Sequence, residues 1–461
     1  MEAVIHSLGL TRNPAKGQWE PSQRVDHLGL TVSTELSEGG GRYLVPEAKL
    51  NRIRTFASDL LRRLRHQRRL VPVRQLAKFA GLAQSIYLAL PCARMFLRSL
   101  HDAVATKRDW QSDVRVSRQG IRDLEWWTLL PPKVVGRSIY TEPTTKMVQS
   151  DACGHSWGGQ YEKLWANGRF HGKEKALHIT AKEMLGAHRV VESFLPELQG
   201  HHVRFLEDNQ AVVYTLRSRT SKSKVLMRMI RRFYAMLDLH SISISIEYVP
   251  TDENEADAPS RIVDRADWRL SPSLWHRVDQ LCGPHTYDRF ASTASALLPK
   301  YDTLYRTPGR PSADAFAQAW GKEHNFVNPG WGSRRRPYLL LERVGQFLRA
   351  RPSVAATVAA PYRPGEAFFQ ALRRDSQQMH VLEVGSDDLL PCHDRVWLPT
   401  TRYLCLFRFI AGRPAPTYQG RFGASNLTWQ QLLSMEGEAL SHTTSFASSS
   451  SLYPTAWPPD V

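Results

Sequence analysis

The stretch that decides the fold opens with Lys146-Met-Val-Gln-Ser-Asp-Ala-Cys153 and closes with Asn254-Glu-Ala-Asp-Ala-Pro-Ser-Arg261. Short runs separated by glycine turns predict a three-strand antiparallel meander, and a helix from about Thr180 follows it. Two further strands alternate with helices, so that the five strands are expected at 146–151, 156–161, 165–171, 202–208 and 242–249. The order βββαβαβα predicts an α/β domain with one mixed five-stranded sheet and flanking helices.

Four acidic residues stand at the ends of these elements. Asp151 and Asp208 each end a predicted strand, Glu183 lies early in the first helix, and Asp257 begins the last, short helix. Strand ends of one sheet come together, so the two aspartates are expected to be neighbours within reach of both helical carboxylates. Each residue alone would be read as a turn, cap or solvated position. Together they predict one acidic cleft.

Such a cleft calls for cations. Four carboxylates in one place repel each other, and the cluster makes sense only if cations neutralise it. Carboxylate oxygens are hard ligands that select Mg²⁺ or Mn²⁺. Two such ions about 3.5–4 Å apart activate a water and stabilise the leaving oxygen in phosphodiester hydrolysis. We therefore expect two Mg²⁺ or Mn²⁺ ions as cofactors.

These residues resemble the ribonuclease H domain of reverse transcriptases, in the form found in retrotransposons. The resemblance rests on four motifs in the family's order: Ser150-Asp-Ala152, His178-Ile-Thr-Ala-Lys-Glu-Met-Leu-Gly-Ala187, Asp208-Asn-Gln210 and Ala256-Asp-Ala-Pro-Ser-Arg261. It implies a ribonuclease H-like fold, with catalysis and metal ligation by Asp151, Glu183, Asp208 and Asp257. The implied reaction cuts the RNA strand of an RNA–DNA hybrid and leaves a 3′-hydroxyl and a 5′-phosphate.

One position departs from the family pattern. Many ribonucleases H carry a His in the loop before the last Asp, whereas Pro250-Thr-Asp-Glu-Asn-Glu-Ala256 has none. His240, at the foot of the fifth predicted strand, is the candidate substitute. If it does not substitute, turnover is expected to be slower.

The overall charge favours a nucleic-acid partner. There are 61 Lys plus Arg against 44 Asp plus Glu, which gives a formal charge of +17 and a pI of about 9.8. Binding to an acidic membrane surface is the alternative explanation, but the sequence contains no amphipathic anchor and no long apolar run. We therefore expect binding to an RNA–DNA hybrid or another nucleic acid, and no membrane.

The candidate nucleic-acid contacts lie mainly after the third acidic residue. Asn209 and Gln210 are placed to contact the sugar 2′-hydroxyl that distinguishes RNA from DNA. In a ribonuclease H, the basic helix that follows faces the DNA strand, and clustered cations favour phosphates. A plain solvated face is the alternative. Two of the predicted phosphate-binding residues, Arg62 and Arg63, lie on an N-terminal basic helix at 46–67. The others are Arg217, Arg219, Lys222, Lys224 and Arg228, with Arg231 and Arg232 on the same helix as Arg228.

The cysteines point to a reducing compartment. There are five, an odd number, without a CxxC pair or metal-ligand spacing. The first residues show no charged start followed by an apolar run, so we expect no signal peptide. These features predict an intracellular protein, either cytoplasmic or nuclear.

Four regions are expected along the chain. Residues 1–132 resemble the thumb and connection of a reverse transcriptase, with a hairpin at 28–45, where Leu28-Gly29 resembles a primer-gripping motif, and helices at 46–67, 73–83 and 90–104. Residues 140–262 form the ribonuclease H-like domain. Residues 263–372 resemble the region that follows ribonuclease H in retrotransposons of the DIRS type, and are expected to be a small, mostly helical or α/β module. Residues 373–461 are poorly defined, with a disordered tail at 441–461.

No polymerase site is predicted. A palm needs a Tyr-x-Asp-Asp type hairpin, and the only adjacent Asp pair is Asp387-Asp388, far downstream. The chain therefore resembles the C-terminal part of a DIRS-like reverse transcriptase, with a polymerase-bearing retroelement protein as an expected partner. Two alternatives stay open: a non-catalytic nucleic-acid-binding remnant, and a nuclease or integrase of related fold that acts on DNA.

Overall fold

The computed structural model describes residues 6–9, 11, 21–38, 40–130, 136–140, 143–144, 146–262, 267–309, 314–331, 338–396 and 398–413. The chain divides into two compact units, one comprising Met1–Lys163 with Arg169–Ser260 and the other Leu164–Gly168 with Arg261–Val461. The predicted boundary at 132 and the predicted tail at 441–461 lie outside the described residues. Among the described residues, no helix has the length and apolar character needed to cross a membrane.

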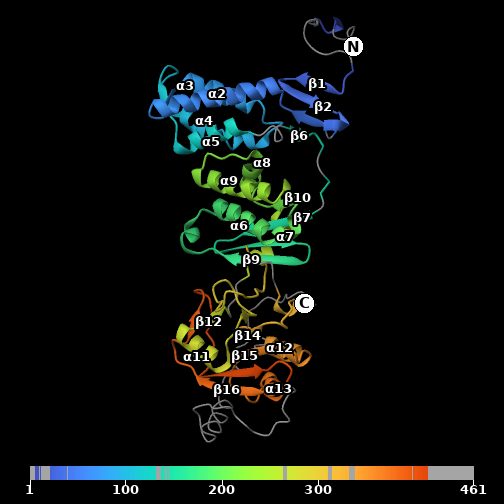
Figure 1. Cartoon of the computed structure of the whole chain (residues 1–461), viewed down its shortest axis with the longest axis vertical. Coiled ribbons are helices and arrows are strands. Elements are labelled where there is room, and N and C mark those ends of the chain that lie inside the picture. Colours follow the sequence, from blue (N-terminus) through green and yellow to red (C-terminus); the bar gives the residue numbers. More distant parts are fainter. Residues whose placement is uncertain are drawn as a thin grey trace. The chain divides into compact units, whose positions relative to one another are not determined.

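The first part of the first unit combines a small sheet with a group of helices (Figure 1). The sheet has the order β1-β2-β3-β6 with antiparallel neighbours, and β4 and β5 form a separate antiparallel ribbon. The strands are β1 Arg24–His27, β2 Leu30–Ser33, β3 Arg42–Leu44, β4 Leu70–Pro72, β5 Asp113–Arg115 and β6 Gly136–Ser138. The helices are α2 Glu47–His66, α3 Val73–Gln84, α4 Arg98–Ala105 and α5 Arg118–Leu129.

Apolar positions at three- and four-residue spacing hold these helices together. α2 packs against α5 and α3, and its buried side chains include Ile53, Leu60 and Leu64. The Trp127 side chain of α5 is fully buried, with its ring edge-on to Phe79 of α3 at 6.1 Å between centroids. The other face of α2 carries the exposed Arg52, Arg62, Arg63 and Arg65, whereas Arg54 is half-buried and donates to the Leu130 carbonyl.

Two predictions in this region are wrong in detail. Leu28 and Gly29 do not lie in a strand; with φ of 50° and 76° they form the turn between β1 and β2. The helix predicted at 90–104 is split into a short 3₁₀ helix, Pro91–Arg94, and α4, which begins at Arg98. Pro91 explains why no helix includes Leu90, because proline disfavours helical backbone at the residue before it.

The rest of the first unit is built on β11, β10, β7 and β8. These strands belong to a five-stranded sheet of order β11-β10-β7-β8-β9, whose edge strand β9 falls almost entirely in the residues assigned to the second unit. β7, β10 and β11 are parallel, and β8 is antiparallel to β7, which confirms the predicted mixed sheet. The strands are β7 Lys146–Ala152, β8 Ser156–Tyr161, β9 Leu164–Arg169, β10 His202–Glu207 and β11 Ser243–Tyr248. The helices are α6 Ile179–Ser193, α7 Leu195–Leu198, α8 Gln210–Ser218, α9 Lys224–Leu239 and α10 Asp257–Ser260.

The second unit has its own five-stranded sheet, of order β13-β14-β15-β18-β16. β13, β14 and β15 are parallel, and β18 is antiparallel to both β15 and β16. The strands are β13 Tyr287–Asp288, β14 His324–Val327, β15 Ala355–Pro361, β16 Gln378–Glu383 and β18 Tyr403–Phe409, with a separate pair, β12 Trp268–Leu270 and β17 Leu389–Pro391. The helices are α11 Pro272–Cys282, α12 Leu339–Arg349 and α13 Ala367–Asp375.

The expectation that residues from 373 onward are poorly defined is wrong for 373–396 and 398–413. β18 lies inside the sheet between β15 and β16, so its residues 404–407 are all fully buried. A strand buried on both faces is a continuous apolar run without alternation, which gives no periodic signal in the sequence. The module is thus α/β, and it extends well past 372.

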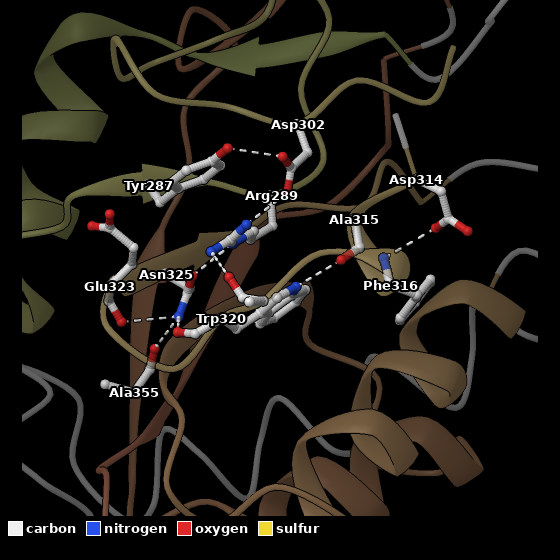
Figure 2. Close-up of polar contacts among 11 residues, drawn as sticks. Tyr287, Arg289, Asp302, Asp314, Ala315, Phe316, Trp320, Glu323, Asn325 and Ala355 are labelled. Atoms are coloured by element: carbon white, nitrogen blue, oxygen red, sulfur yellow. Dashed lines mark hydrogen bonds and ion pairs between the residues drawn. The ribbon is translucent and has the colours of Figure 1, made fainter. Parts of the chain in front are cut away.

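A buried ion pair connects β13 to the following loops (Figure 2). The Arg289 guanidinium donates to Asp302 at 2.8 Å and to the Asn325 side chain at 2.6 Å, and both charged side chains are almost fully buried. Tyr287 donates its hydroxyl to Asp302 at 2.9 Å and places its ring 3.7 Å from the Arg289 guanidinium carbon. A buried charge without a partner is energetically costly. The network therefore favours the one arrangement of the loops in which Arg289 and Asp302 remain paired.

Replacing Asp302 by Ala is expected to lower the free energy of unfolding of the second unit by about 3–5 kcal/mol, because it leaves a buried, unpaired Arg289. Lys300→Ala is the matched control: it breaks a surface pair with Glu323 nearby and should cost about 1 kcal/mol or less. Denaturant unfolding of the two variants measures the difference. Equal, small losses would contradict the role given to the buried pair.

Candidate active site

Asp151 lies near the end of β7, the central strand of the sheet. β7 pairs with β10 on one side and β8 on the other, and its residues from Val148 to Ala152 are buried. The Asp151 side chain is 7% exposed and lies opposite Gly158 of β8. A carboxylate in this position is held by the sheet itself and is largely removed from water.

Glycines allow α6 to pack closely on this part of the sheet. A Cβ added to Gly159 of β8 would lie 2.3 Å from Val190 of α6. Gly186 of α6 faces the Ala152 Cβ, which would be 3.4 Å from an added Cβ. Glu183 precedes Gly186 by three residues and therefore lies on the same side of the helix. The close packing thus brings Glu183 to the end of β7.

The surroundings of Glu183 disfavour its charge. Burial raises the pKa of this carboxyl to about 10, and the nearby charges of Glu207, Asp151 and Asp208 contribute in the same direction. The Ala152 backbone N–H offsets a small part of that shift. The Glu183 Oε2 atom is buried and accepts no hydrogen bond from any residue that the structure describes. An ionised Glu183 therefore needs a positive charge beside it.

Asp208 follows β10 directly and is half-buried. The parallel register pairs Glu207 with Ser150, so one residue further along Asp208 comes level with Asp151. Glu207 itself is fully buried, and it accepts a hydrogen bond from the Ser150 hydroxyl at 2.5 Å. Burial is the main cause that raises the pKa of Glu207 to about 8. The cluster thus contains a fifth carboxyl that was not predicted.

Asp257 begins α10, as predicted, and is half-buried. The segment before it is tied to β7, because the Asn254 side-chain amide donates to the Ser150 carbonyl at 2.9 Å. α10 lies directly on β8, since a Cβ on Gly158 would be 2.1 Å from the Ser260 nitrogen. The structure thus couples Asp151, Glu183 and Asp208 electrostatically and places Asp257 on a helix that packs on β8, next to the strand of Asp151.

The carboxylates of Asp151, Glu183, Asp208 and Asp257 are ligands of the type that hard divalent cations prefer. Positive charge would relieve the mutual repulsion of Asp151, Glu183 and Asp208. One of the carboxylate oxygens, Glu183 Oε2, is buried and has no hydrogen-bond partner among the described residues. Within the described ranges, however, no three His, Cys, Asp or Glu side chains are already arranged around a common metal position. The metal ligands therefore stay a prediction.

His240 cannot take the place of the missing loop His. It caps the end of α9, and its carbonyl accepts from Gly200, which precedes β10. β7, β10 and β11 are parallel, so the beginnings of β10 and β11 lie at the opposite end of the sheet from Asp151 and Asp208. The suggested substitution is wrong for this geometric reason.

The predicted basic residues divide into two groups. Lys222, Lys224 and Arg228 are exposed around the start of α9, and Arg232 is exposed further along it. Arg217 donates to the Ile246 carbonyl at 2.7 Å, and Arg219 ends α8 with its guanidinium 4.2 Å from the Tyr234 ring centroid. In the part of the chain that the structure describes, the first group makes no such contacts.

Arg231 has a structural contact that the sequence did not reveal. It forms an ion pair at 2.9 Å with Asp123 of α5, whose side chain is 1% exposed, and donates to the Met95 carbonyl at 2.7 Å. The helical N-terminal part and α9 are thereby joined within the first unit. This contact contradicts a primary role for Arg231 on a nucleic-acid-facing surface.

Asn209 and Gln210 also differ in their surroundings. Asn209 is the N-cap of α8, with its side-chain oxygen accepting from Ala211 and Val212. Gln210 is exposed in the first turn. A contact between Asn209 and a sugar hydroxyl would have to use the amide NH₂, because its oxygen is engaged in the cap. Arg62 is exposed and 3.4 Å from Asp59, and Arg63 is exposed.

The sequence reading missed three residues that shape the site: Glu207, Ser150 and Asn254. Glu207 directly precedes Asp208, so the pair of acids at a strand end was visible. The burial of Glu207 could not be predicted. The side chains of neighbouring strand residues point to opposite faces of the sheet, but this alternation does not tell which face is covered by helices. Asn254 acts through a backbone carbonyl, a contact that leaves no sequence signature.

Comparisons with known proteins find the following. No family model matches this chain, and no curated protein matches it. Among solved structures, a ribonuclease H1 from the halophilic archaeon Halobacterium salinarum is 16% identical, with a TM-score of 0.22, over 25% of this chain and 92% of that one. A foamy viral protease-reverse transcriptase in complex with RNA/DNA hybrid is 13% identical, with a TM-score of 0.21, over 54% of this chain and 33% of that one.

A third solved structure, LC11-RNase H1 in complex with RNA/DNA hybrid, is 12% identical, with a TM-score of 0.21, over 25% of this chain and 93% of that one. This chain thus spans nearly the whole length of the two ribonucleases and a third of the viral protein. At such identities and TM-scores the likeness carries no functional argument, which has to come from the residues of this chain.

Glu183→Gln is expected to stabilise the protein when divalent cations are chelated. The folded-state pKa of Glu183 is raised above its ordinary value, so its unfavourable contribution is absent below about pH 4.5 and grows as the pH rises toward 10. At pH 8 the free energy of unfolding should increase by roughly 2–4 kcal/mol, and the gain should vanish near pH 4.5.

Thermal unfolding in EDTA at several pH values measures this effect. Glu253→Gln is the matched control, since Glu253 is exposed and its replacement should change little at any pH. A Glu183→Gln variant that is no more stable than the parent at pH 8 would contradict the repulsion described for this site.

Proposed function

We propose that this protein is a metal-dependent endoribonuclease that hydrolyses the RNA strand of RNA–DNA hybrids. The observation that carries the proposal is the electrostatic coupling of Asp151, Glu183 and Asp208 at the carboxyl ends of β7 and β10. A buried group of like charges is costly to keep ionised, and neutralising cations are the chemistry that makes it useful.

The residues would act as follows. Asp151 and Asp208, level with each other on adjacent strands, would hold two Mg²⁺ or Mn²⁺ ions, with Glu183 completing one ion site and Asp257 the other. When bound, such ions supply an activated water and stabilise the leaving oxygen. The buried Glu207 and its hydrogen bond from Ser150 would keep the two strand ends in register. Asp257 would be positioned through the Asn254 contact to β7.

Nucleic acid would bind through exposed cations around the start of α9. The side chains of Lys222, Lys224 and Arg228 are exposed and favour phosphates, in line with the net charge of +17. The resemblance of the motifs further supports an origin in a DIRS-like retrotransposon, with a polymerase-bearing retroelement protein as partner. In that setting the N-terminal helices and hairpin would help to hold the hybrid.

The test is cleavage of a labelled RNA–DNA hybrid in Mg²⁺ or Mn²⁺, with matched RNA and DNA duplexes alongside. Asp208→Asn should reduce hybrid cleavage by at least about 100-fold, because it removes a metal-binding charge while keeping the side-chain shape. Asp252→Asn, an exposed residue of the loop before α10, is the control and should cleave like the parent.

Three outcomes would count against the proposal. Hybrid binding without cleavage by folded protein would favour a non-catalytic nucleic-acid-binding remnant. Cleavage of DNA duplexes in preference to hybrids would favour a DNA nuclease of related fold. Equal cleavage by the Asp208→Asn variant and the parent would place the active site elsewhere.

A further inference from the structure

Four arginines line a cavity in the N-terminal part of the first unit. All four precede the residues of the carboxylate cluster in the sequence. The cavity has a volume of about 420 Å³ and is lined by Arg65, Arg68, Arg69 and Arg115 together with Leu61, Leu64 and Ile121. This volume falls within the range of about 300–1,000 Å³ that is typical of ligand pockets. We call this feature the arginine pocket.

Three segments fix the walls of the arginine pocket. Leu61, Leu64 and Arg65 come from the last turns of α2, Arg115 ends β5, and Ile121 lies in α5. The turn after α2 is held by the Arg69 N–H bond to the Leu64 carbonyl at 3.0 Å and by the Val116 N–H bond to the Arg69 carbonyl at 2.9 Å. β4 pairs with β5, which sets Arg115 opposite Leu70. The arginines are therefore gathered by the fold.

The charges of the pocket are not neutralised by the part of the chain that the structure describes. Among the described residues, none of these four arginine side chains takes part in an ion pair or a hydrogen bond. This sets them apart from Arg231 and Arg289, whose guanidinium groups pair with buried aspartates. Four like charges around one cavity repel each other, so an anionic occupant would be bound favourably.

The backbone of the pocket is strained. Arg68 and Arg69 have φ of 46° and 69°, a region that side chains other than Gly rarely adopt. With positive φ at both residues, the side chains of Arg68 and Arg69 leave the backbone in different directions from those at a helix end with negative φ. Strain of this kind is typical of ligand-binding segments. A Gly at position 68 would relieve it, yet Arg is present.

The shape of the pocket indicates the class of ligand. Regular duplex is held by phosphate contacts on an exposed surface. Here the buried Leu61 and Leu64 and the half-buried Ile121 line the cavity together with the arginines and give it an apolar lining. A nucleotide that has left the duplex presents both a phosphate and an exposed sugar and base, and unpaired bases stack on guanidinium planes as well as on aromatic rings.

We propose that the arginine pocket binds an unpaired nucleotide, the single-stranded overhang of a hybrid, through its phosphate and base. This inference rests on the proposed function, because it assumes that the chain handles RNA–DNA hybrids. The apolar lining and the strained turn at Arg68 and Arg69 distinguish this site from a general basic surface. RNA and DNA overhangs share the required chemistry, so the experiment includes both.

The test compares binding of three labelled substrates of equal duplex length: a blunt RNA–DNA hybrid, one with a DNA overhang and one with an RNA overhang. Binding is measured in EDTA, so that cleavage plays no part. The parent protein should bind at least one overhang substrate about 10-fold more tightly than the blunt hybrid. Its affinity for that substrate should also fall more steeply with salt.

The test variant is Arg68→Gly with Arg115→Gln, which removes two cations while relieving the strained φ at position 68. It should lose the overhang preference, and the slope of log affinity against log salt should fall by roughly 2. The control, Arg74→Gln with Arg122→Gln, removes two exposed cations of the same helical part and should keep the preference. Thermal unfolding checks that each variant is folded.

The proposal is overturned if the parent binds blunt and overhang substrates equally, or if the Arg68/Arg115 variant keeps the preference. Failure of the proposed function gives a different result. If no hybrid is cut in Mg²⁺ but the overhang preference depends on the pocket arginines, the catalytic proposal fails and the pocket stands. If cleavage occurs and the preference is absent, only the pocket proposal fails.

Discussion

Repulsion among buried carboxylates is the constraint on which the functional part of this molecule depends. Burial alone disfavours the charge of Glu183, and three neighbouring acids add to the effect. The fold nevertheless holds them together by glycine contacts between α6 and the sheet, by the Ser150 hydrogen bond to Glu207 and by the Asn254 link to β7. The cluster lowers the free energy of unfolding of the protein. Such a local loss of stability is typical of sites that bind a charged ligand.

Two other groups of charge in the chain are handled differently. Arg289 and Asp302 are buried but fully paired, so they fix a loop arrangement in the second unit. The pocket arginines lie around an open cavity and form no ion pair with another described residue. The buried ion pair therefore has a structural role, whereas the carboxylate cluster and the arginine pocket are the two places where this protein is expected to bind metal ions and nucleic acid.

Much of the central sheet could be predicted, because its strands and helices follow clear periods and end at recognisable residues. Asp151, Glu183 and Asp208 came together for that reason. Contacts between distant segments could not be predicted: Arg231 reads as one more cation of a basic helix until its partner, Asp123, 108 residues away, is seen. β18 was missed because a strand covered on both faces has no alternation, and His240 was misplaced because sheet direction decides which end it occupies.

Divalent metal binding tests the central claim most directly, since it needs no assumption about the substrate. Titration of the whole chain with Mn²⁺, followed by calorimetry and by the electron paramagnetic resonance of free Mn²⁺, should show two bound ions. Asp151→Asn should reduce that number. Because ligation by a carboxyl of raised pKa releases a proton, the heat should also depend on the buffer. Folded protein that binds no Mn²⁺ at millimolar concentration would contradict the account.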